Sequence, residues 1–469
     1  MPMTSADPIA GLPESPARDP WTLRGARVLS AETVPAVVDV VIVDGRIAAM
    51  GAAGTLDAGR IVEVPGLDLL PGAIDLHVHL RDPGQTHKET VETGTAAAAA
   101  GGTTLVCDMP STAPQVTTAA RFAHKLAGWQ GRAFVDHALW AGGRDPMELR
   151  GMAALGAVGV KIYMATSPGF DELFSPDVDA VAGVLEVSAE IGWATVIHVG
   201  DQAASDAHRE QLIGAGRRDP RAVLEVGRGP GNLGALDRVL DIAVATGTPL
   251  HLAHLSAYGD RALDLFAAAK PSAPFLTAES CVPALDEGAD LDRLGMMVMP
   301  TVFTGDSRDR WFAALQDGTV DAIATDHAPH TRVEKAAGIE DAWAVPGGYP
   351  ALETSLPLAY DAHLTGRLSA QRLVALTATT PARILGLHHK GRITVGADAD
   401  LVLADPSASW TVDESRLHSL VGWSPFHGRT LRGRLLATLL GGTVVARCGD
   451  IIGPARGRFV RGRNGEGSA

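Results

Sequence analysis

Cysteine is scarce in this chain: its 469 residues include only Cys107, Cys281 and Cys448. These three lie far apart and form no Cys-x-x-Cys pair, so the sequence indicates neither a disulfide framework nor a thiolate zinc site. Lys/Arg-rich runs are also missing, and the formal net charge is −14. We therefore expect no nucleic-acid partner, although a site for an anion would need only local positive charge.

Long apolar runs and targeting signals are missing as well. No apolar stretch is long enough for a membrane-spanning helix, which needs about 20 residues. Residues 1–20 are rich in Pro, Ala, Ser and Asp and lack the charged start and apolar core of a signal peptide. We interpret them as a flexible tail, and we expect a protein of the cytoplasm that does not contact a membrane.

β-rich segments at both ends of the chain flank a middle part with a different pattern. Short strands are predicted over residues 21–70, where Val37–Val43 precedes a turn at Asp44 and Gly45. They are predicted again within residues 388–469, which also include a C-terminal tail. We expect these two pieces to form one small β-sandwich domain.

Residues 71–387 alternate between short β-rich runs and stretches rich in Ala, Leu and Glu. The β-rich runs are Ala73–His79, Thr103–Met109, Ala133–Trp140, Ala157–Tyr163, Ala194–Val199, Pro249–Leu255, Phe275–Glu279 and Val320–Asp326. Most precede a helical pattern, and one such pattern begins at a capping box, Thr86-x-x-Glu89, and ends at Gly101 and Gly102. Eight β-then-α units predict an α/β fold with a closed parallel barrel of the TIM type, (β/α)8.

Two histidines lie at the end of the first predicted barrel strand, in Asp75-Leu-His77-Val-His79-Leu-Arg81. Because side chains alternate along a strand, His77 and His79 point the same way, and two imidazoles on one face suit a zinc-class metal. A His-x-His pair alone is as compatible with two structural histidines as with a metal site.

Polar residues also fall at the same end of further strands, where the functional groups of such barrels lie. They are Lys161 on the fourth strand, His198 on the fifth, His251 and His254 on the sixth and Asp326 on the eighth. A single histidine in an apolar strand is more often a core residue than a ligand. Polar groups at the same end of five strands are difficult to explain in that way, so we predict a metal site there.

Lys161 is the unusual member of this set, because a lysine amine is a poor metal ligand. It lies in an apolar run, Gly159-Val-Lys161-Ile-Tyr163, where burial would lower its pKa. The free amine could then react with carbon dioxide to give a carbamate, whose two oxygens can bridge two metals. The alternative is a surface or ion-pairing lysine, which the apolar run disfavours.

Several motifs along the chain belong together. They are His77-Val-His-Leu-Arg-Asp-Pro-Gly84, Ala99-Ala-Gly-Gly-Thr-Thr104, Lys161-Ile-Tyr-Met164, His254-Leu-Ser256, Thr325-Asp-His-Ala-Pro-His330 and Lys390-Gly-Arg-Ile-x-x-Gly-Ala-Asp-Ala-Asp400. This combination resembles the dihydroorotase, allantoinase and hydantoinase group of cyclic amidohydrolases. The resemblance covers nearly all of residues 21–460, and it is more specific for the superfamily than for the substrate.

The resemblance implies two zinc ions per chain, although other divalent metals are possible. The ligands would be His77, His79 and Asp326 for the more buried ion, and His198 and His254 for the second. Carboxylated Lys161 and a hydroxide would bridge the two ions. Asp326 would also act as general base and then as general acid toward the departing ring nitrogen. His254 is preferred over His251 because its His-x-Ser pattern is the part shared across the group.

The resemblance also indicates a site for a substrate carboxylate. Dihydroorotases use an arginine and a histidine for it, and the matching residues here are Arg81 and His330. A third position that contacts the carboxylate, an asparagine in the group, is Ser111 in this chain. Two further departures are Gly200, where the group has a glutamate, and Met299, where it has an asparagine.

We therefore hypothesise a dihydroorotase of pyrimidine biosynthesis, which interconverts dihydroorotate and N-carbamoyl-aspartate. Allantoinase or hydantoinase (dihydropyrimidinase) activity is the alternative, because Asp108-Met-Pro110 and Glu279-Ser-Cys281 look more like allantoinase. A non-catalytic homologue would be marked by lost metal ligands, and none is lost. The expected partners are a small anionic cyclic amide and further copies of the chain, in a dimer or tetramer.

Overall fold

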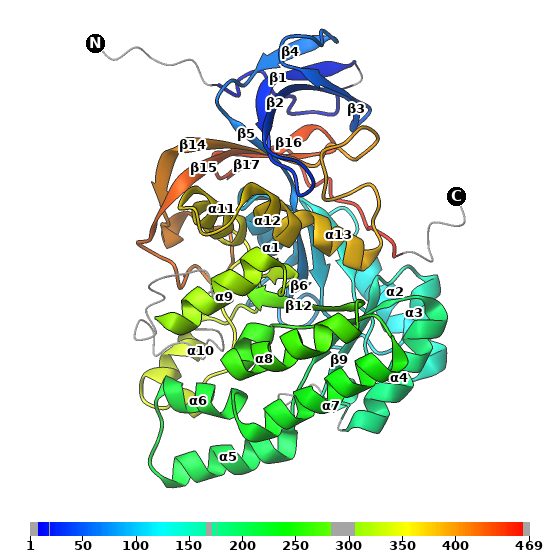
Figure 1. The fold of residues 1–469 in the computed structure, drawn as a ribbon, viewed down its shortest axis with the longest axis vertical. Coiled ribbons are helices and arrows are strands. Elements are labelled where there is room, and N and C mark those ends of the chain that lie inside the picture. The colour runs from blue at the N-terminus through cyan, green and yellow to red at the C-terminus, as the bar shows by residue number, and fades with distance from the viewer. Residues whose placement is uncertain (1–7, 18, 166–170, 176, 283–304, 463–469) are drawn as a thin grey trace.

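Two regions make up the structure: a barrel of alternating strands and helices, and a smaller β domain beside it (Figure 1). The computed structural model describes residues 8–17, 19–165, 171–175, 177–282 and 305–462. Strands from the two ends of the chain, blue and orange in Figure 1, lie together at one end of the molecule. The structure confirms the expected TIM-type barrel with a small β-sandwich domain built from both chain ends.

Eight parallel strands form the barrel wall, and each overlaps a β-rich run that the sequence predicts. They are β6 (Ala73–Val78), β7 (Thr103–Asp108), β8 (Asp136–Leu139), β9 (Gly159–Tyr163), β10 (Ala194–His198), β11 (Leu250–Leu252), β12 (Leu276–Cys281) and β13 (Ala322–Ala324). Two single bridges close the wall. Ala141 pairs with Val160 between β8 and β9, and Val78 of β6 pairs with His327, which follows β13.

Helices cover the outside of the wall, and the interval between β10 and β11 holds three of them. The helices are α1 (Val91–Ala100), α2 (Ala119–Trp129), α3 (Pro146–Ala154), α4 (Val178–Ile191), α5 (Gln202–Gly214), α6 (Pro220–Gly227), α7 (Pro230–Thr246), α8 (Asp260–Ala269), α9 (Asp306–Asp317), α10 (Arg332–Ala336), α11 (Ser355–Leu364), α12 (Ala370–Val374) and α13 (Thr380–Leu385). Aspartates begin several of them: Asp145, Asp177 and Asp219 accept backbone N–H groups at the starts of α3, α4 and α6.

The first helix begins later than the capping box at Thr86 predicts. Thr90 is the N-cap of α1. Glu89 is fully buried and accepts a hydrogen bond from His327 Nε2 at 3.2 Å. That part of the prediction was wrong because a tertiary contact uses the glutamate, whereas the end of the helix at Gly101 was predicted correctly.

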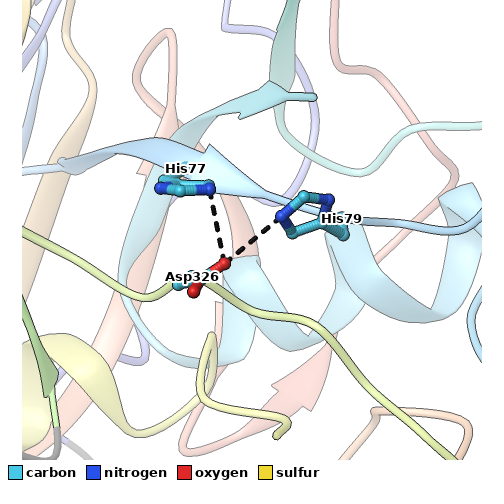
Figure 2. Close-up of side chains that lie close together, drawn as sticks. All are labelled: His77, His79 and Asp326. Atoms are coloured by element: carbon cyan, nitrogen blue, oxygen red, sulfur yellow. Dashed lines mark ion pairs between the residues drawn. The ribbon is translucent and has the colours of Figure 1, made fainter. Parts of the chain in front are cut away.

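Strand β6 has a register irregularity between Asp75 and Val78 that decides where its side chains point. Leu76 packs in one hydrophobic cluster with residues of β7 and β8, whereas Val78 packs in another cluster with residues of the surrounding helices. Strict alternation would place both on one face, so the bulge shifts the pattern by one residue. His77 and His79 consequently both point toward Asp326 (Figure 2).

A nine-stranded sheet forms the small domain. Its strands are β1 (Trp21–Val28), β2 (Ala36–Val43), β3 (Arg46–Ala52), β4 (Arg60–Glu63), β5 (Asp68–Pro71), β14 (Leu401–Thr411), β15 (Thr430–Leu440), β16 (Thr443–Arg447) and β17 (Asp450–Ile451). Strands β5 and β14 pair antiparallel, with Leu69 opposite Leu403, so a backbone ladder joins the two ends of the chain. The turn predicted at Asp44 and Gly45 connects β2 to β3, and both residues have a positive φ.

Both ends of the described chain pack against the body of the protein. Ile9 and Leu12 are buried in the core of the small domain, so this part of the predicted flexible tail is not free. After β17 the chain returns to the barrel, where the Val460 N–H donates to the His137 carbonyl at 2.8 Å. Within the described part of the chain, no helix combines the length and apolar composition needed to cross a membrane.

Lys390 joins the small domain to the barrel. Its Nζ lies 2.7 Å from a carboxylate oxygen of Asp136 on β8 and 2.6 Å from one of Asp400, just before β14. All three side chains are largely buried. Burial by itself lowers the pKa of Lys390, but the surrounding aspartates raise it above its ordinary value.

Replacing Lys390 by Met leaves two buried carboxylates without their cation, so we expect the free energy of unfolding to fall by about 3–5 kcal/mol. Urea unfolding followed by circular dichroism measures the change. Arg150→Met removes an exposed ion pair with Glu190 and serves as the control, with stability near that of the wild type. Equal stability of the two variants would contradict the role given to Lys390.

Candidate metal centre

Three ligand-type side chains meet at the mouth of the barrel, as Figure 2 shows. His77 lies in β6, His79 directly follows it, and Asp326 follows β13. Asp326 Oδ1 lies 3.3 Å from His77 Nε2 and 3.2 Å from His79 Nε2, and the three ligand atoms lie within 4.8 Å of one another. Two imidazole nitrogens and a carboxylate oxygen in this arrangement can hold a metal ion.

The backbone is left-handed at three residues of the mouth. Arg81, His254 and Asp326 have φ values of 60°, 36° and 47°. Non-glycine residues adopt strained conformations of this kind at a cost of about 1–3 kcal/mol, and such residues cluster at functional sites. Elsewhere in the described chain only Asp44 and Cys448 share a positive φ without being glycine. The strain is therefore concentrated where the polar side chains converge.

A buried glutamate fixes the orientation of His77. Glu279 of β12 is fully buried, and its Oε1 lies 2.6 Å from His77 Nδ1. Burial alone would raise the pKa of Glu279, but His77 and His251 bring it well below its ordinary value, so the group is a carboxylate. His77 Nδ1 therefore donates its proton to Glu279, and His77 Nε2 presents a lone pair on the side of Asp326.

Asp326 is the most exposed of the three. Its side chain is 19% exposed, compared with 12% for His79 and 2% for His77. Burial by itself raises the pKa of Asp326, but the opposing effect of His77 and His79 is larger. The pKa of Asp326 therefore lies below its ordinary value. The group is a carboxylate that faces the mouth and can exchange a proton with a molecule bound there.

A second set of predicted ligands lies beside the first. His254 Nε2 and His198 Nδ1 are 2.9 Å apart, and the ring centroids of His254 and His77 are 5.6 Å apart. Lys161 of β9 is buried, which lowers its pKa to about 8, and it interacts electrostatically with Asp326. The structure thus brings all six predicted ligands to the same end of the barrel.

Two buried nitrogens in this set lack partners. Within the described residues, Lys161 Nζ and His254 Nδ1 are buried and have no hydrogen-bond partner. Leaving polar atoms unpaired in the interior is costly, so a group bound between them would remove an unfavourable feature. Four imidazoles and a carboxylate are also the donors that zinc-class metals prefer. The residues present therefore fit the metal site that the sequence predicts.

Next to the candidate metal ligands, two cations face one imidazole. Arg81 Nη2 lies 3.1 Å from His330 Nε2, and Lys88 Nζ lies 3.1 Å from His330 Nδ1. Burial, assisted by both cations, lowers the pKa of His330 to about 2, so the ring is neutral and carries one N–H. A neutral ring has one nitrogen that can accept, so only one of the two cations can donate to it. The other cation faces the ring N–H, which places two donors against each other. Arg81 Nε is also buried without a partner among the described residues.

The positions that depart from the motifs of the resembling group differ in their surroundings. Ser111 Oγ lies 2.8 Å from His79 Nδ1, so its hydroxyl supports a candidate metal ligand, and its contact with substrate stays a prediction. A Cβ on Gly200 would lie 2.6 Å from the Ala165 Cβ, which leaves no room for a glutamate unless the backbone shifts. Met299 lies outside the described residues.

Two members of the site were given no role from the sequence. Glu279 had a usable signal, because an acidic residue inside an apolar predicted strand requires a buried partner. Lys88 had none, since it lies in a polar segment before α1 where a solvated lysine is the ordinary expectation. His251, the less favoured of the two histidines near β11, contacts Glu279 at 3.1 Å rather than the other predicted ligands.

Comparison with known proteins extends these observations to the whole chain. Residues 69–445 match the Amidohydrolase family. A dihydroorotase of Halobacterium salinarum is 35% identical over 438 residues, covering 90% of this chain and 99% of that protein. An allantoinase of Rubrobacter xylanophilus is 34% identical over 439 residues, covering 92% and 95%. A solved L-hydantoinase (dihydropyrimidinase) from Arthrobacter aurescens has a TM-score of 0.88 at 30% identity, covering 94% of this chain and 99% of that one.

We expect about two equivalents of divalent metal per chain when the protein is purified without chelator. His79→Ala and His198→Ala, which remove candidates from the two different sets, should each lower the content toward one equivalent. His137→Asn is the control, because this buried histidine packs against Trp129 and Phe459, away from the mouth. Elemental analysis measures the content, and an unchanged value in both mouth variants would contradict the assignment.

Proposed function

The chain belongs to the Amidohydrolase family, and from this premise we propose that it opens and closes an anionic cyclic amide, as a dihydroorotase does with dihydroorotate and N-carbamoyl-aspartate. It is a metal-dependent cyclic amidohydrolase that acts on C–N bonds. Its relatives divide between dihydroorotases, allantoinases and hydantoinases at 31–35% identity, so the choice of ring has to come from the site itself.

The proposal of an anionic substrate depends on the arrangement of Arg81, Lys88 and His330. The neutral His330 ring faces two cationic donors, and Arg81 keeps an unused N–H at Nε. A carboxylate oxygen placed between Arg81 and His330 would accept from both and would remove the donor–donor contact. A neutral ring such as hydantoin or allantoin offers no such charge. These contacts favour a ring that carries a carboxylate.

We assign the metal ligands as the sequence predicts. His77, His79 and Asp326 would hold one ion, His198 and His254 would hold the second, and Lys161, after its amine has reacted with carbon dioxide, would bridge them. When bound, the metals supply Lewis acidity toward the amide carbonyl and toward water. The buried, unpartnered Lys161 amine supports this assignment, because carboxylation exchanges a costly buried ammonium for an anion among ligands.

Asp326 is proposed to move the proton of the reaction. In the hydrolytic direction, the oxygen of water bonds to the amide carbon, and the bond from that carbon to the ring nitrogen breaks. The carboxylate of Asp326 takes a proton from the water and delivers it to the departing nitrogen. Its partial exposure beside the buried His77 supports this task, because the proton acceptor has to reach a bound ring.

Allantoinase or hydantoinase activity is the second candidate. The observation that favours it is Ser111, whose hydroxyl lies against His79 where dihydroorotases have an asparagine for the carboxylate. Hydrolysis of dihydroorotate, allantoin, hydantoin and dihydrouracil by the zinc-loaded protein decides between the two candidates. The proposal requires dihydroorotate to be the best substrate of the four.

Asp326→Asn should lower kcat by about 100-fold or more, because it removes both a metal ligand and the proton carrier. The fold should persist, since residues at this end of a barrel serve function rather than stability. Steady-state kinetics measure the loss of kcat, and thermal unfolding checks that the variant is folded. A kcat close to that of the wild type would rule out the proposed role.

Arg81→Met tests the substrate class. We expect kcat/KM for dihydroorotate to fall by an amount equivalent to about 2–4 kcal/mol, while hydantoin turnover and metal content stay near wild-type values. Arg81→Lys should recover only part of the loss, because a lysine cannot make the two parallel hydrogen bonds of a guanidinium.

Arg121→Met provides the matched control, since Arg121 pairs with the exposed Glu172 on the barrel surface and should leave both substrates unaffected. An equal loss on dihydroorotate and hydantoin in Arg81→Met would contradict the carboxylate contact. Absence of wild-type activity on dihydroorotate would favour the second candidate.

A further inference from the structure

Glu279 receives hydrogen bonds from three parts of the barrel. Its Oε1 lies 2.6 Å from His77 Nδ1 of β6 and accepts from the backbone N–H of His254 at 3.0 Å. Its Oε2 lies 3.1 Å from His251 Nε2 of β11. The side chain has no exposed surface. A single carboxylate therefore contacts a member of each set of candidate metal ligands.

The Glu279 carboxylate determines which ring nitrogens donate in this network. A carboxylate can only accept, so His77 donates from Nδ1 and His251 donates from Nε2. Thr277 Oγ1 lies 2.9 Å from His251 Nδ1 and 3.4 Å from the Leu250 carbonyl oxygen, to which it can donate. Glu279 therefore orients both rings, and Thr277 contacts the far nitrogen of His251.

We propose that Glu279 is the positioning residue of the metal centre, and that His251 and Thr277 hold its carboxylate in place. The proposal rests on the metal site assigned above to His77 and His254. Glu279 directs His77 Nε2 toward Asp326. It also anchors the backbone of His254 in the left-handed conformation, with φ 36° and ψ 48°.

The charge of Glu279 has an effect of its own. A carboxylate that accepts from an imidazole raises the basicity of the opposite ring nitrogen, and the metal affinity rises with it. A purely structural glutamate would need only to satisfy its hydrogen bonds. An isosteric amide separates these two roles, because it keeps an acceptor oxygen for His77 and His254 but carries no charge. Its NH2 would replace Oε2, so His251 would have to accept at Nε2 and carry its proton on Nδ1, beside Thr277 Oγ1.

Two substitutions of Glu279 therefore test the proposal. The zinc dissociation constant is measured by competition with a chromophoric chelator, which requires no substrate. We expect zinc affinity to fall about 10-fold in Glu279→Gln and about 100-fold in Glu279→Ala. His251→Phe removes only the donor to Oε2 and should give an affinity between those of the wild type and Glu279→Ala.

Asp68→Asn is the matched control. Asp68 of β5, in the small domain, is an equally buried carboxylate that accepts from Arg27 and from the Tyr360 hydroxyl of α11 and contacts none of the candidate ligands. It should lower the unfolding temperature and leave zinc affinity unchanged. Thermal unfolding of the metal-free variants confirms that each is folded, and Glu279→Gln decides the matter if Glu279→Ala does not fold.

The outcomes distinguish this proposal from the proposed function. Zinc affinities of both Glu279 variants within about twofold of the wild type would overturn the positioning role and leave the cyclic amidohydrolase assignment standing. A fall in Asp68→Asn as large as in Glu279→Gln would also overturn it, since a general loss of stability would then explain the effect. A wild-type protein that binds no zinc would overturn both proposals.

Discussion

The contact that closes the barrel also assembles the site. Val78 of β6 pairs with His327, and the His79 N–H donates to the His327 carbonyl at 2.8 Å. Asp75 reinforces this contact, because its Oδ1 accepts from the backbone N–H groups of His77 at 3.1 Å and Thr325 at 3.2 Å. The first and last strands are thereby held in a register that brings two imidazoles against a carboxylate some 250 residues away in sequence. Any loss of closure would separate the ligands.

The mouth contains features that are unfavourable in the absence of a ligand, and the stability of the rest of the molecule offsets them. Three of its residues have strained backbones, the Lys161 amine is buried without a hydrogen-bond partner among the described residues, and His330 faces two donors. A cation or an anion bound where the side chains converge would supply partners for Lys161 and His330, so binding offsets part of this cost. The opposite pattern holds at the junction of the two domains, where Lys390 and its aspartates satisfy one another. Stability and ligand binding are therefore served by different ends of the barrel.

Much of this architecture could be predicted from the sequence, because it depends on patterns that repeat along the chain. Eight β-rich runs, five of them with polar residues at the same end, were enough to identify the barrel and to bring His77 and its neighbours together. The bulge in β6 gave no such signal. The resemblance indicated a role for Arg81 but not its geometry: β6 ends at Val78, and Arg81 reaches His330 from a left-handed turn. Glu89 looked like part of a helix cap, yet a distant His327 uses it, and contacts of this kind depend on the assembled fold.

The most direct measurement is anomalous diffraction at the zinc absorption edge, from crystals of the protein purified with its own metal. The account predicts a peak about 2.0–2.2 Å from His77 Nε2, His79 Nε2 and an Asp326 oxygen, with His77 Nδ1 still bonded to Glu279. A second peak should lie beside His198 and His254. Zinc found only elsewhere on the protein, or a His77 ring turned away from Glu279 in a loaded site, would contradict it.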